Sequence, residues 1–184
     1  MRYGLDQIDF EVGEDGGIQN YIDTLAECAA ASNGFIVEMG IYRGTGSTVA
    51  FQRGLQNHPN PLQVSMDYDE KYLYWRPTVP WWHYLEADDR KPETVEKVKA
   101  IAGDRTPGII YIDTNHDYEQ MTAELANWGP YAAPDTLFLF HDTWLYGGYN
   151  EPMNRAIIEW ADANGWLFED WKKERHGLGR MTKR

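Results

Sequence analysis

The sequence is poor in cysteine, in basic residues and in long apolar runs, and each shortage excludes a class of protein. Cys28 is the single cysteine, so no disulfide can form within the chain, and its setting among alanines favours a packing role over a nucleophilic one. Lysine and arginine number only 17 against 29 aspartates and glutamates, and the net charge is −12. Neither nucleic acid nor an anionic membrane is therefore an expected partner, because phosphate binding depends on clustered basic side chains. No stretch resembles a signal peptide or a membrane span, so we expect a cytoplasmic protein.

The chain has the length and composition of one α/β domain. It contains 184 residues, of which 42% are hydrophobic and 25% charged. We expect a single domain over residues 1–184, with a short N-terminal segment at 1–16 and an aromatic, lid-like loop at about 68–84. That loop, in a chain with 8 tryptophans and 12 tyrosines, is equally compatible with the interface of a homodimer.

Predicted strands and helices alternate along the chain. Helices are predicted over 17–32, 47–56, 92–103, 118–128 and 153–165 from their apolar spacing and end signals. Buried strands are predicted over 35–38, 62–68, 83–89, 108–113 and 136–142, and a closing pair over 166–172 and 177–183. Such alternation requires a mostly parallel, doubly wound sheet with helices on both faces.

A glycine-rich turn joins the first predicted strand to the next helix, in "FIVEMGIYRGTGS". Gly40, Gly44 and Gly46 permit backbone geometry that a side chain would block, and Ser47 can cap the helix. The turn is not a P-loop, since no lysine follows the last glycine, and its spacing differs from the Gly-x-Gly-x-x-Gly fingerprint of dinucleotide-binding proteins. Open α/β sheets bind ligands at such turns, although glycines that serve only packing remain an alternative.

Four predicted strands end in an acid: Glu38, Asp67, Asp113 and Asp142. The carboxyl ends of parallel strands share one edge of the sheet, so these acids should converge on one crevice. At the second strand, Asp67, with Asp69 as the alternative, is placed to accept hydrogen bonds from ribose hydroxyls. A turn-forming role for the same aspartate is the competing interpretation.

Two further acids follow the third predicted strand. Asp88 and Asp89 are placed to meet the edge of an adenine ring, and they suit the start of a helix equally well.

Asp113 and Asp142 end two strands that we expect to be neighbours. Two close carboxylates, completed by the hydroxyl of Thr143 or by water, describe a site for Mg²⁺. A cation there would remove the repulsion between the two carboxylates, whereas hydrogen bonds to backbone amides are the competing interpretation.

Histidines occur twice at the same predicted edge. His116 and His141 are both candidates for a general base, with His116 preferred because it lies in the loop after a strand and His141 can equally serve packing. His58, His83 and His176 are predicted to be surface or lid residues. The order of residues supports no nucleophilic triad.

With these residues assembled, the sequence resembles the class I S-adenosylmethionine-dependent methyltransferases, in particular methyltransferase family 24, and more distantly the metal-dependent catechol-type O-methyltransferases. The resemblance rests on "VEMGIYRGTGS", "SMDYD", "YIDTNHDYE" and "FHDTW". It implies a seven-stranded Rossmann-like sheet whose last strand is antiparallel, and metal ligation by Asp113 and Asp142. The cofactor contacts that follow from the resemblance and from the strand ends are Glu38, Gly40, Tyr42, Gly44, Gly46, Ser47, Asp67, Asp88 and Asp89. One departure is Thr114, where the family usually has glycine, and it can narrow the approach to the metal or the substrate.

The resemblance implies Mg²⁺-assisted transfer of a methyl group from S-adenosylmethionine to the hydroxyl of a small molecule. Catalysis would fall to Asp113 and to His116 or His141. Aromatic side chains expected to flank a sugar, a phenol or a natural product of that kind are Trp81, Trp82, Tyr146 and Tyr149. Two alternatives stay open: a metal-dependent hydrolase that uses the same acids and histidines, and a non-catalytic binding module on the same fold.

Overall fold

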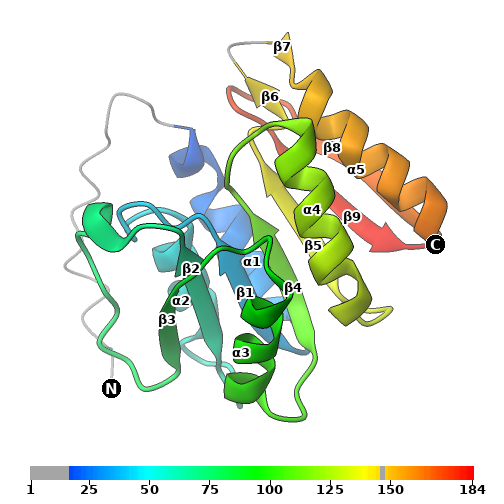
Figure 1. Ribbon diagram of the computed structural model, residues 1–184. Helices are drawn as coiled ribbons and strands as arrows, with labels where there is room; N and C mark the ends of the chain where they lie inside the picture. Colours follow the sequence, from blue (N-terminus) through cyan, green and yellow to red (C-terminus); the bar gives the residue numbers. More distant parts are fainter. Residues whose placement is uncertain (1–16, 146–147) are drawn as a thin grey trace.

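The computed structural model describes residues 17–145 and 148–184, and its centre is a seven-stranded sheet (Figure 1). The strand order is β3-β2-β1-β4-β5-β9-β8. The strands are β1 (Phe35–Met39), β2 (Gln63–Asp67), β3 (Trp82–Glu86), β4 (Pro107–Ile112), β5 (Leu137–His141), β8 (Trp166–Lys172) and β9 (Leu178–Lys183). Strands β1 to β5 are mutually parallel, and β9 runs antiparallel between β5 and β8. The predicted doubly wound sheet with an antiparallel closing strand is confirmed.

Helices cover both faces of this sheet, as Figure 1 shows. One face carries α1 (Ile22–Ala31) and α2 (Ser47–Leu55), and the other carries α3 (Pro92–Ala102), α4 (Tyr118–Trp128) and α5 (Glu151–Asn164). Two apolar cores result, because alternate strand residues face opposite sides. In β1, for example, Ile36 packs under α1 and α2, whereas Val37 packs in the core under α3, α4 and α5.

Short elements complete the chain. The 3₁₀ turns of the described residues are η2 (Ile18–Tyr21), η3 (Glu70–Tyr72) and η4 (Gly129–Tyr131), and a separate hairpin pairs β6 (Trp144–Leu145) with β7 (Gly148–Tyr149). No helix in the described part of the chain is long and apolar enough to cross a membrane.

The structure corrects the predicted aromatic loop at 68–84 and the predicted third strand at 83–89. Strand β3 begins at Trp82 and ends at Glu86, so the last part of that loop belongs to the sheet. The side chain of Trp82 also binds to the neighbouring strand, because its indole N–H donates to Ser65 Oγ on β2, 2.9 Å away. After β5, the chain forms the β6–β7 hairpin before α5 begins.

The register of the parallel strands positions the functional edge. Ile112 at the end of β4 pairs with Phe140 of β5. The residues that follow them, Asp113 and His141, therefore lie side by side at the carboxyl edge of the sheet. Asp142 then leaves the strand with φ of 61°, a left-handed conformation that is uncommon outside glycine. Its backbone is held there, since Asp142 N donates to Gly177 O (3.2 Å) and Asn150 Nδ2 donates to Asp142 O (3.0 Å).

Candidate active site

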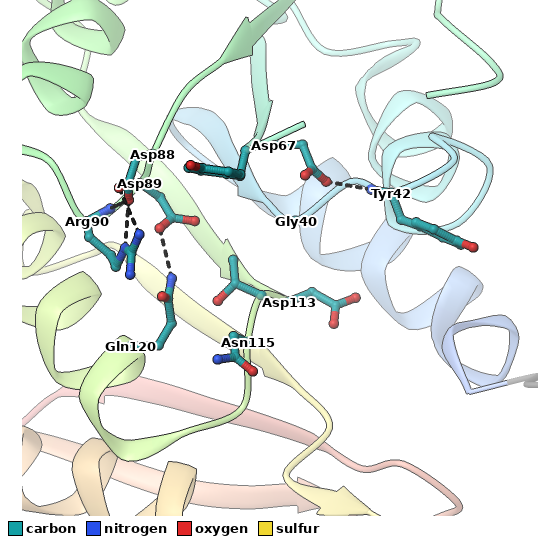
Figure 2. A pocket seen from close by; sticks show the side chains of 11 residues that line it. Gly40, Tyr42, Asp67, Asp88, Asp89, Arg90, Asp113, Asn115 and Gln120 are labelled. Atoms are coloured by element: carbon teal, nitrogen blue, oxygen red, sulfur yellow. Dashed lines mark hydrogen bonds and ion pairs between the residues drawn. The ribbon is translucent and has the colours of Figure 1, made fainter. Parts of the chain in front are cut away.

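A cavity of about 350 Å³ opens at the carboxyl edge of β1, β2 and β4. Its lining residues are Gly40, Tyr42, Asp67, Tyr68, Asp88, Asp89, Arg90, Asp113, Thr114, Asn115 and Gln120. Figure 2 shows Tyr42 and Asp67 on one side of the cavity and Asp88, Asp89, Arg90 and Gln120 on the other. Of the predicted cofactor contacts, the cavity therefore unites Gly40, Tyr42, Asp67, Asp88 and Asp89.

Gly40 is the tightest point of the glycine-rich turn. Its φ is +78°, and a Cβ added there would lie 1.9 Å from the backbone oxygen of Asp113. Gly40 N donates to Met66 O (3.0 Å), and Asp113 N donates to Met39 O (3.0 Å), which brings the ends of β1, β2 and β4 together. Only glycine permits both this conformation and this approach.

Asp67 fastens the turn from the neighbouring strand. Its Oδ2 accepts a hydrogen bond from the backbone N–H of Tyr42 at 2.9 Å. Asp69, the alternative for the same role, instead accepts from Lys71 N and pairs with the Lys71 side chain at 2.6 Å, and it is not among the described residues that line the cavity. The geometry thus favours Asp67 as the acid that meets a ligand.

The cavity is strongly acidic. Among the described residues of its lining, Arg90 is the one basic residue, and Asp88 engages it through Nε–Oδ1 (2.8 Å) and Nη2–Oδ2 (2.9 Å) contacts. The Arg90 hydrogen bond also lowers the pKa of Asp88. Asp67, Asp89 and Asp113 add further negative charge, so the cavity suits a cationic ligand better than a phosphate.

A buried pair of acids, Asp89 and Glu124, lies at one wall of the cavity. Gln120 Nε2 donates to Asp89 Oδ1 (3.0 Å) and to Glu124 Oε1 (2.6 Å), and the hydroxyl of Thr114 also donates to Glu124. Burial and the charge of Asp89 raise the pKa of Glu124 to about 8, and burial raises the pKa of Asp89 to about 6. Thr114, the departure from the family pattern, therefore contributes a hydrogen bond to this wall.

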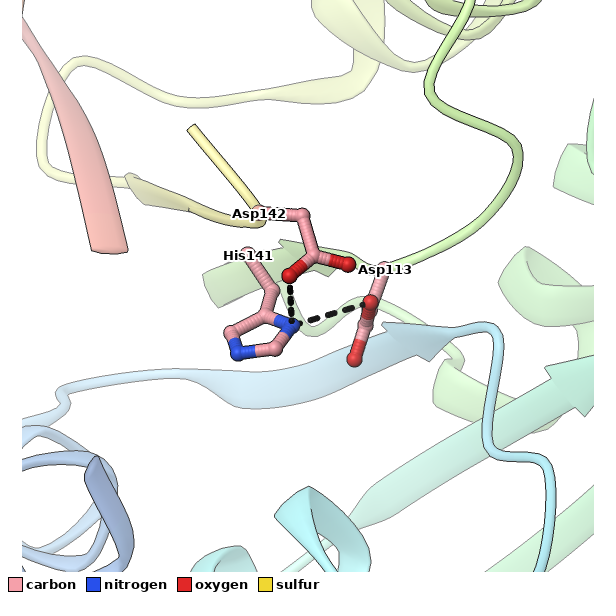
Figure 3. A group of neighbouring side chains, drawn as sticks. All are labelled: Asp113, His141 and Asp142. Atoms are coloured by element: carbon pink, nitrogen blue, oxygen red, sulfur yellow. Dashed lines mark hydrogen bonds and ion pairs between the residues drawn. The ribbon is translucent and has the colours of Figure 1, made fainter. Parts of the chain in front are cut away.

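Asp113 is shared between this cavity and a cluster of acids and histidines. Figure 3 shows the carboxylates of Asp113 and Asp142 converging on Nδ1 of His141. The nitrogen lies 3.3 Å from Asp113 Oδ1 and 3.2 Å from Asp142 Oδ1, and these three side chains form the candidate metal cluster among the described residues. The predicted convergence of Asp113 and Asp142 is what the strand register produces.

Two more histidines contact the same carboxylates. His116 Nε2 lies 3.0 Å from Asp142 Oδ2 and 3.7 Å from Asp113 Oδ1, and His176 Nδ1 lies 2.8 Å from Asp142 Oδ1. The prediction that His176 is a surface or lid residue is wrong. Its position follows from the antiparallel β9, whose first residue, Leu178, pairs with His141, so the residues just before β9 return to the carboxyl edge.

The charges in the cluster stabilise one another. Burial opposes the ionisation of Asp113, but His141 and His116 lower its pKa to about 2, and the same histidines hold the pKa of Asp142 far below its ordinary value despite burial. Burial would lower the pKa of both imidazoles, yet the two carboxylates raise it to about 9 for His116 and about 10 for His141. Any cation that binds these carboxylates competes with the imidazole protons.

Glu38 has a different environment from the other strand-end acids. It is fully buried within β1 and accepts hydrogen bonds from Thr48 Oγ1 (3.0 Å), Gln63 Nε2 (2.7 Å) and Ser65 Oγ (2.5 Å). Burial raises its pKa. Glu38 is not among the residues that line the cavity, and it ties the start of α2 to β1 and β2 beneath the glycine-rich turn.

Gly44, Gly46 and Ser47, also predicted to contact a cofactor, lie outside the cavity lining. Gly44 has φ of +75°, and a Cβ there would lie 2.3 Å from the backbone oxygen of Trp75. Ser47 is buried at the first position of α2. These residues shape the turn that carries Gly40 and Tyr42.

Several other predicted site residues do not join the cluster. The hydroxyl of Thr143, expected to be a metal ligand, donates to Asp170 Oδ1 at 3.1 Å. Trp82 pairs with Gln63 at the amino ends of β3 and β2, and the indole N–H of Trp81 donates to Gln52 (3.1 Å), so the two tryptophans lie at the edge of the sheet opposite the cavity.

Tyr149 and Tyr146 were predicted to flank a substrate. Tyr149 lies on β7, with its ring in edge contact with Trp144 (centroids 6.1 Å apart), close in sequence to Asp142. Tyr146 lies outside the described residues. Residues that line the cavity without having been predicted are Tyr68, Arg90, Asn115 and Gln120.

Comparison with known proteins agrees with this architecture, which is that of the class I S-adenosylmethionine-dependent methyltransferases. The chain belongs to methyltransferase family 24, described as a methyltransferase domain, whose profile matches residues 37–143, more than half of the chain. No curated protein sequence matches the chain at a significant level.

Solved structures share the fold at low sequence identity. CalS11, a TDP-rhamnose 3'-O-methyltransferase of calicheamicin biosynthesis, is 16% identical with a TM-score of 0.66, over 97% of this chain and 89% of CalS11. The SAH-bound methyltransferase PaMTH1 of Podospora anserina is 12% identical with a TM-score of 0.71, over 96% of this chain and 83% of PaMTH1. MycE of the mycinamycin pathway, in complex with Mg, SAH and mycinamycin VI, is 14% identical with a TM-score of 0.60, and 99% of this chain corresponds to 52% of MycE.

Proposed function

We propose that this methyltransferase transfers the methyl group of S-adenosylmethionine to a hydroxyl oxygen of a small molecule, with the whole chain acting as one domain. The observation that carries the proposal is the position of Asp113, which lines the acidic cavity and also belongs to the cluster with His141 and Asp142. A cofactor in the cavity and an acceptor at the cluster would thus meet at one residue. Such proximity can remove several kcal/mol of the reaction barrier.

The charge of the cavity supports S-adenosylmethionine as the ligand. The sulfonium and ammonium groups of this cofactor are positive, and Asp67 and Asp89 supply negative charge that Arg90, bound to Asp88, does not offset. PaMTH1 and MycE were solved with SAH, the demethylated product of that cofactor. A hydrolase with the same acids and histidines would leave this cavity without a role.

The acid–histidine cluster fits a divalent cation. Asp113, Asp142 and His141 offer one ligand atom each, and these atoms lie within 4.8 Å of one another. The buried His116 Nε2 lacks a hydrogen bond of proper geometry despite its 3.0 Å distance from Asp142. When bound, a cation would lower the pKa of an acceptor hydroxyl and orient it.

Within this chain, His116 is the residue placed to take the proton of that hydroxyl. The side chain of His116 is 26% exposed, whereas that of His141 is 7% exposed, so His116 is the more accessible of the two. Both lie beside the same carboxylates, and accessibility separates their roles.

The β6–β7 hairpin is the proposed acceptor side. Trp144 and Tyr149 present two rings in edge contact directly after Asp142 in the chain, and aromatic faces suit the apolar face of a sugar or a phenol. CalS11 is a TDP-rhamnose 3'-O-methyltransferase and MycE was solved with mycinamycin VI, which supports a sugar-bearing or natural-product acceptor.

Calorimetric titration with S-adenosylhomocysteine tests the cofactor site. Asp67→Asn should weaken binding at least tenfold, whereas Asp104→Asn, the same change at an exposed residue of the α3–β4 turn, should have no effect. At a hundred times its dissociation constant, the ligand should add about 2.7 kcal/mol of stability and raise the unfolding temperature by about 5–10 °C. Folded wild-type protein that binds no S-adenosylhomocysteine would overturn the proposal.

Turnover tests the acceptor site. Consumption of S-adenosylmethionine with a panel of sugars and phenols should be lost in Asp142→Asn, while binding of S-adenosylhomocysteine persists because Asp142 lies outside the cavity lining. A non-catalytic binding module would show no turnover in the wild-type protein with any acceptor.

A further inference from the structure

We infer that the cation site of this chain selects a borderline transition-metal dication, such as Co²⁺, Ni²⁺ or Zn²⁺, over Mg²⁺, with Nδ1 of His141 as a direct ligand beside Asp113 and Asp142. The inference rests on the proposed function, since it concerns the cation of the same site. It goes beyond that function in naming the class of ion and the side chain that selects it.

The distances from His141 Nδ1 to the two carboxylates are those of neighbouring ligands around one small cation. A dication bound at about 2.1 Å has neighbouring ligand atoms about 3.0 Å apart in octahedral geometry and about 3.4 Å apart in tetrahedral geometry. His141 Nδ1 lies 3.2 Å from Asp142 Oδ1 and 3.3 Å from Asp113 Oδ1. Each distance falls between these two values.

The chemistry of the donors decides which cation fits. Mg²⁺ prefers oxygen ligands, whereas imidazole nitrogen suits later transition-metal dications such as Co²⁺, Ni²⁺ and Zn²⁺. His141 is fixed in this position because it is the last residue of β5 and is almost fully buried. Its ring lies between Tyr21, in edge contact at 5.9 Å, and His176, stacked at 6.0 Å.

The two carboxylates are held in place by groups outside the donor set. Tyr111 donates to Asp113 Oδ2 at 3.0 Å, which leaves Oδ1 directed at His141. His176 Nδ1 lies 2.8 Å from Asp142 Oδ1, and Asn150 holds the backbone oxygen of Asp142. Orientation of ligating carboxylates by neighbouring groups is a regular feature of metal sites.

A cluster held only by ion pairs between imidazolium and carboxylate groups is the alternative. Three imidazoles surround Asp142, with nitrogens 2.8, 3.0 and 3.2 Å from its carboxylate oxygens. Two carboxylates need only two imidazolium groups to balance their charge, so the third histidine is in excess. The 3.0 Å contact of His116 also lacks hydrogen-bond geometry, since its Nε2 has no hydrogen-bond partner among the described residues. Both facts favour donors that converge on a shared cation.

Competition between Co²⁺ and Mg²⁺ on chelator-treated full-length protein tests the inference. Co²⁺ binding is followed by its visible absorption, and Mg²⁺ is used to displace it. The ratio of Co²⁺ affinity to Mg²⁺ affinity should be at least tenfold higher in the wild-type protein than in the variant His141→Asp, in which all three donors are oxygen atoms. His83→Asp, at an exposed position of β3, is the matched control and should keep the wild-type ratio.

Equal Co²⁺/Mg²⁺ ratios in the wild-type protein and in His141→Asp would overturn the inference, and so would a wild-type protein that binds neither ion. Retained binding of S-adenosylhomocysteine in either case would leave the cofactor part of the proposed function standing, so the two failures are distinguishable. If His141→Asp does not fold, Mn²⁺-loaded wild-type protein decides the matter. Its pulsed paramagnetic resonance spectrum should show coupling to an imidazole ¹⁴N, and absence of that coupling would overturn the inference.

Discussion

The hydroxyl of Tyr111 donates a hydrogen bond to Oδ2 of Asp113 across 3.0 Å, from two positions earlier along the same polypeptide. Residues two apart share a face in extended backbone, and Tyr111 is the last residue but one of β4. The tyrosine is fully buried, so this contact fixes the carboxylate from the interior of the protein.

Loss of that hydroxyl should weaken the cation site without disturbing the cofactor cavity. We expect Tyr111→Phe to reduce the affinity for Co²⁺ or Mn²⁺ by about 10–100-fold, the usual effect of removing a group that orients a ligand. Tyr131→Phe is the control, since its buried hydroxyl has no hydrogen-bond partner among the described residues. Calorimetry with the metal and with S-adenosylhomocysteine measures both effects, and an unchanged metal affinity in Tyr111→Phe would contradict the orienting role.

The close approach of Gly40 to β4 predicts a stability difference between two glycine substitutions. Gly40→Ala places a Cβ 1.9 Å from Asp113 O at φ of +78°, whereas Gly103→Ala adds a Cβ at φ of +63° with nothing within 4 Å. Both variants carry the strain of left-handed backbone, about 1–2 kcal/mol, and only the first carries the collision.

Urea unfolding should therefore show that Gly40→Ala loses more unfolding free energy than Gly103→Ala, with a difference of at least about 1 kcal/mol. Binding of S-adenosylhomocysteine should fall in the first variant alone, because Gly40 lines the cavity and Gly103 ends α3 on the opposite edge. Equal losses in the two variants would show that the turn can move away from β4.

The buried pair of Glu124 and Asp89 predicts a fall in stability as the pH rises. The pKa of Glu124 is raised from about 4.5 to about 8, so between these values the folded protein binds more protons than the unfolded chain. The unfolding free energy should then decrease with rising pH over this range, and most steeply where the unfolded carboxyl has ionised but the folded one has not. The total effect should amount to a few kcal/mol in order of magnitude.

Glu124→Gln should make this slope shallower, because the amide keeps the shape of the side chain and cannot ionise. The slope that remains above pH 6.5 should come from His116 and His141, whose pKa values are also raised. Glu119→Gln, at an exposed position of the same helix, should leave the wild-type slope unchanged. Denaturant unfolding at pH 6, 7 and 8 measures the slopes. A wild-type protein whose stability is constant over this range would show that Glu124 is ionised in the fold.

Much of the site follows from strand order and alternation alone. Asp67, Asp113 and Asp142 each stand at the end of an apolar strand, and the parallel arrangement that the helices impose brings such ends to one edge. The same reasoning failed for Glu38, which lies one residue before the end of β1 and turns into the core beneath α2. A difference of one residue reverses the face of a strand, and sequence patterns do not place strand ends so finely.

The aromatic residues show a second limit of the sequence analysis, which concerns where in the fold a side chain lies. Trp81 and Trp82 were expected at the substrate, yet β3 begins at Trp82, so the pair lies at the amino edge with their indole nitrogens bound to Gln52 and Ser65. An aromatic side chain buries well at an interface, in a core or against a ligand, and composition does not distinguish these places.

The sequence by itself determined the α/β class, the parallel order and the acids at the edge, because periodicity, end signals and chain connectivity are local properties. Only the tertiary structure decided that His176 reaches Asp142, that Thr143 turns to Asp170, and that Glu124 pairs with Asp89. These contacts join residues brought together by the antiparallel insertion of β9 and by helix packing. These contacts form only if elements far apart in the chain are positioned to within a few tenths of an ångström, and no local sequence pattern encodes that positioning.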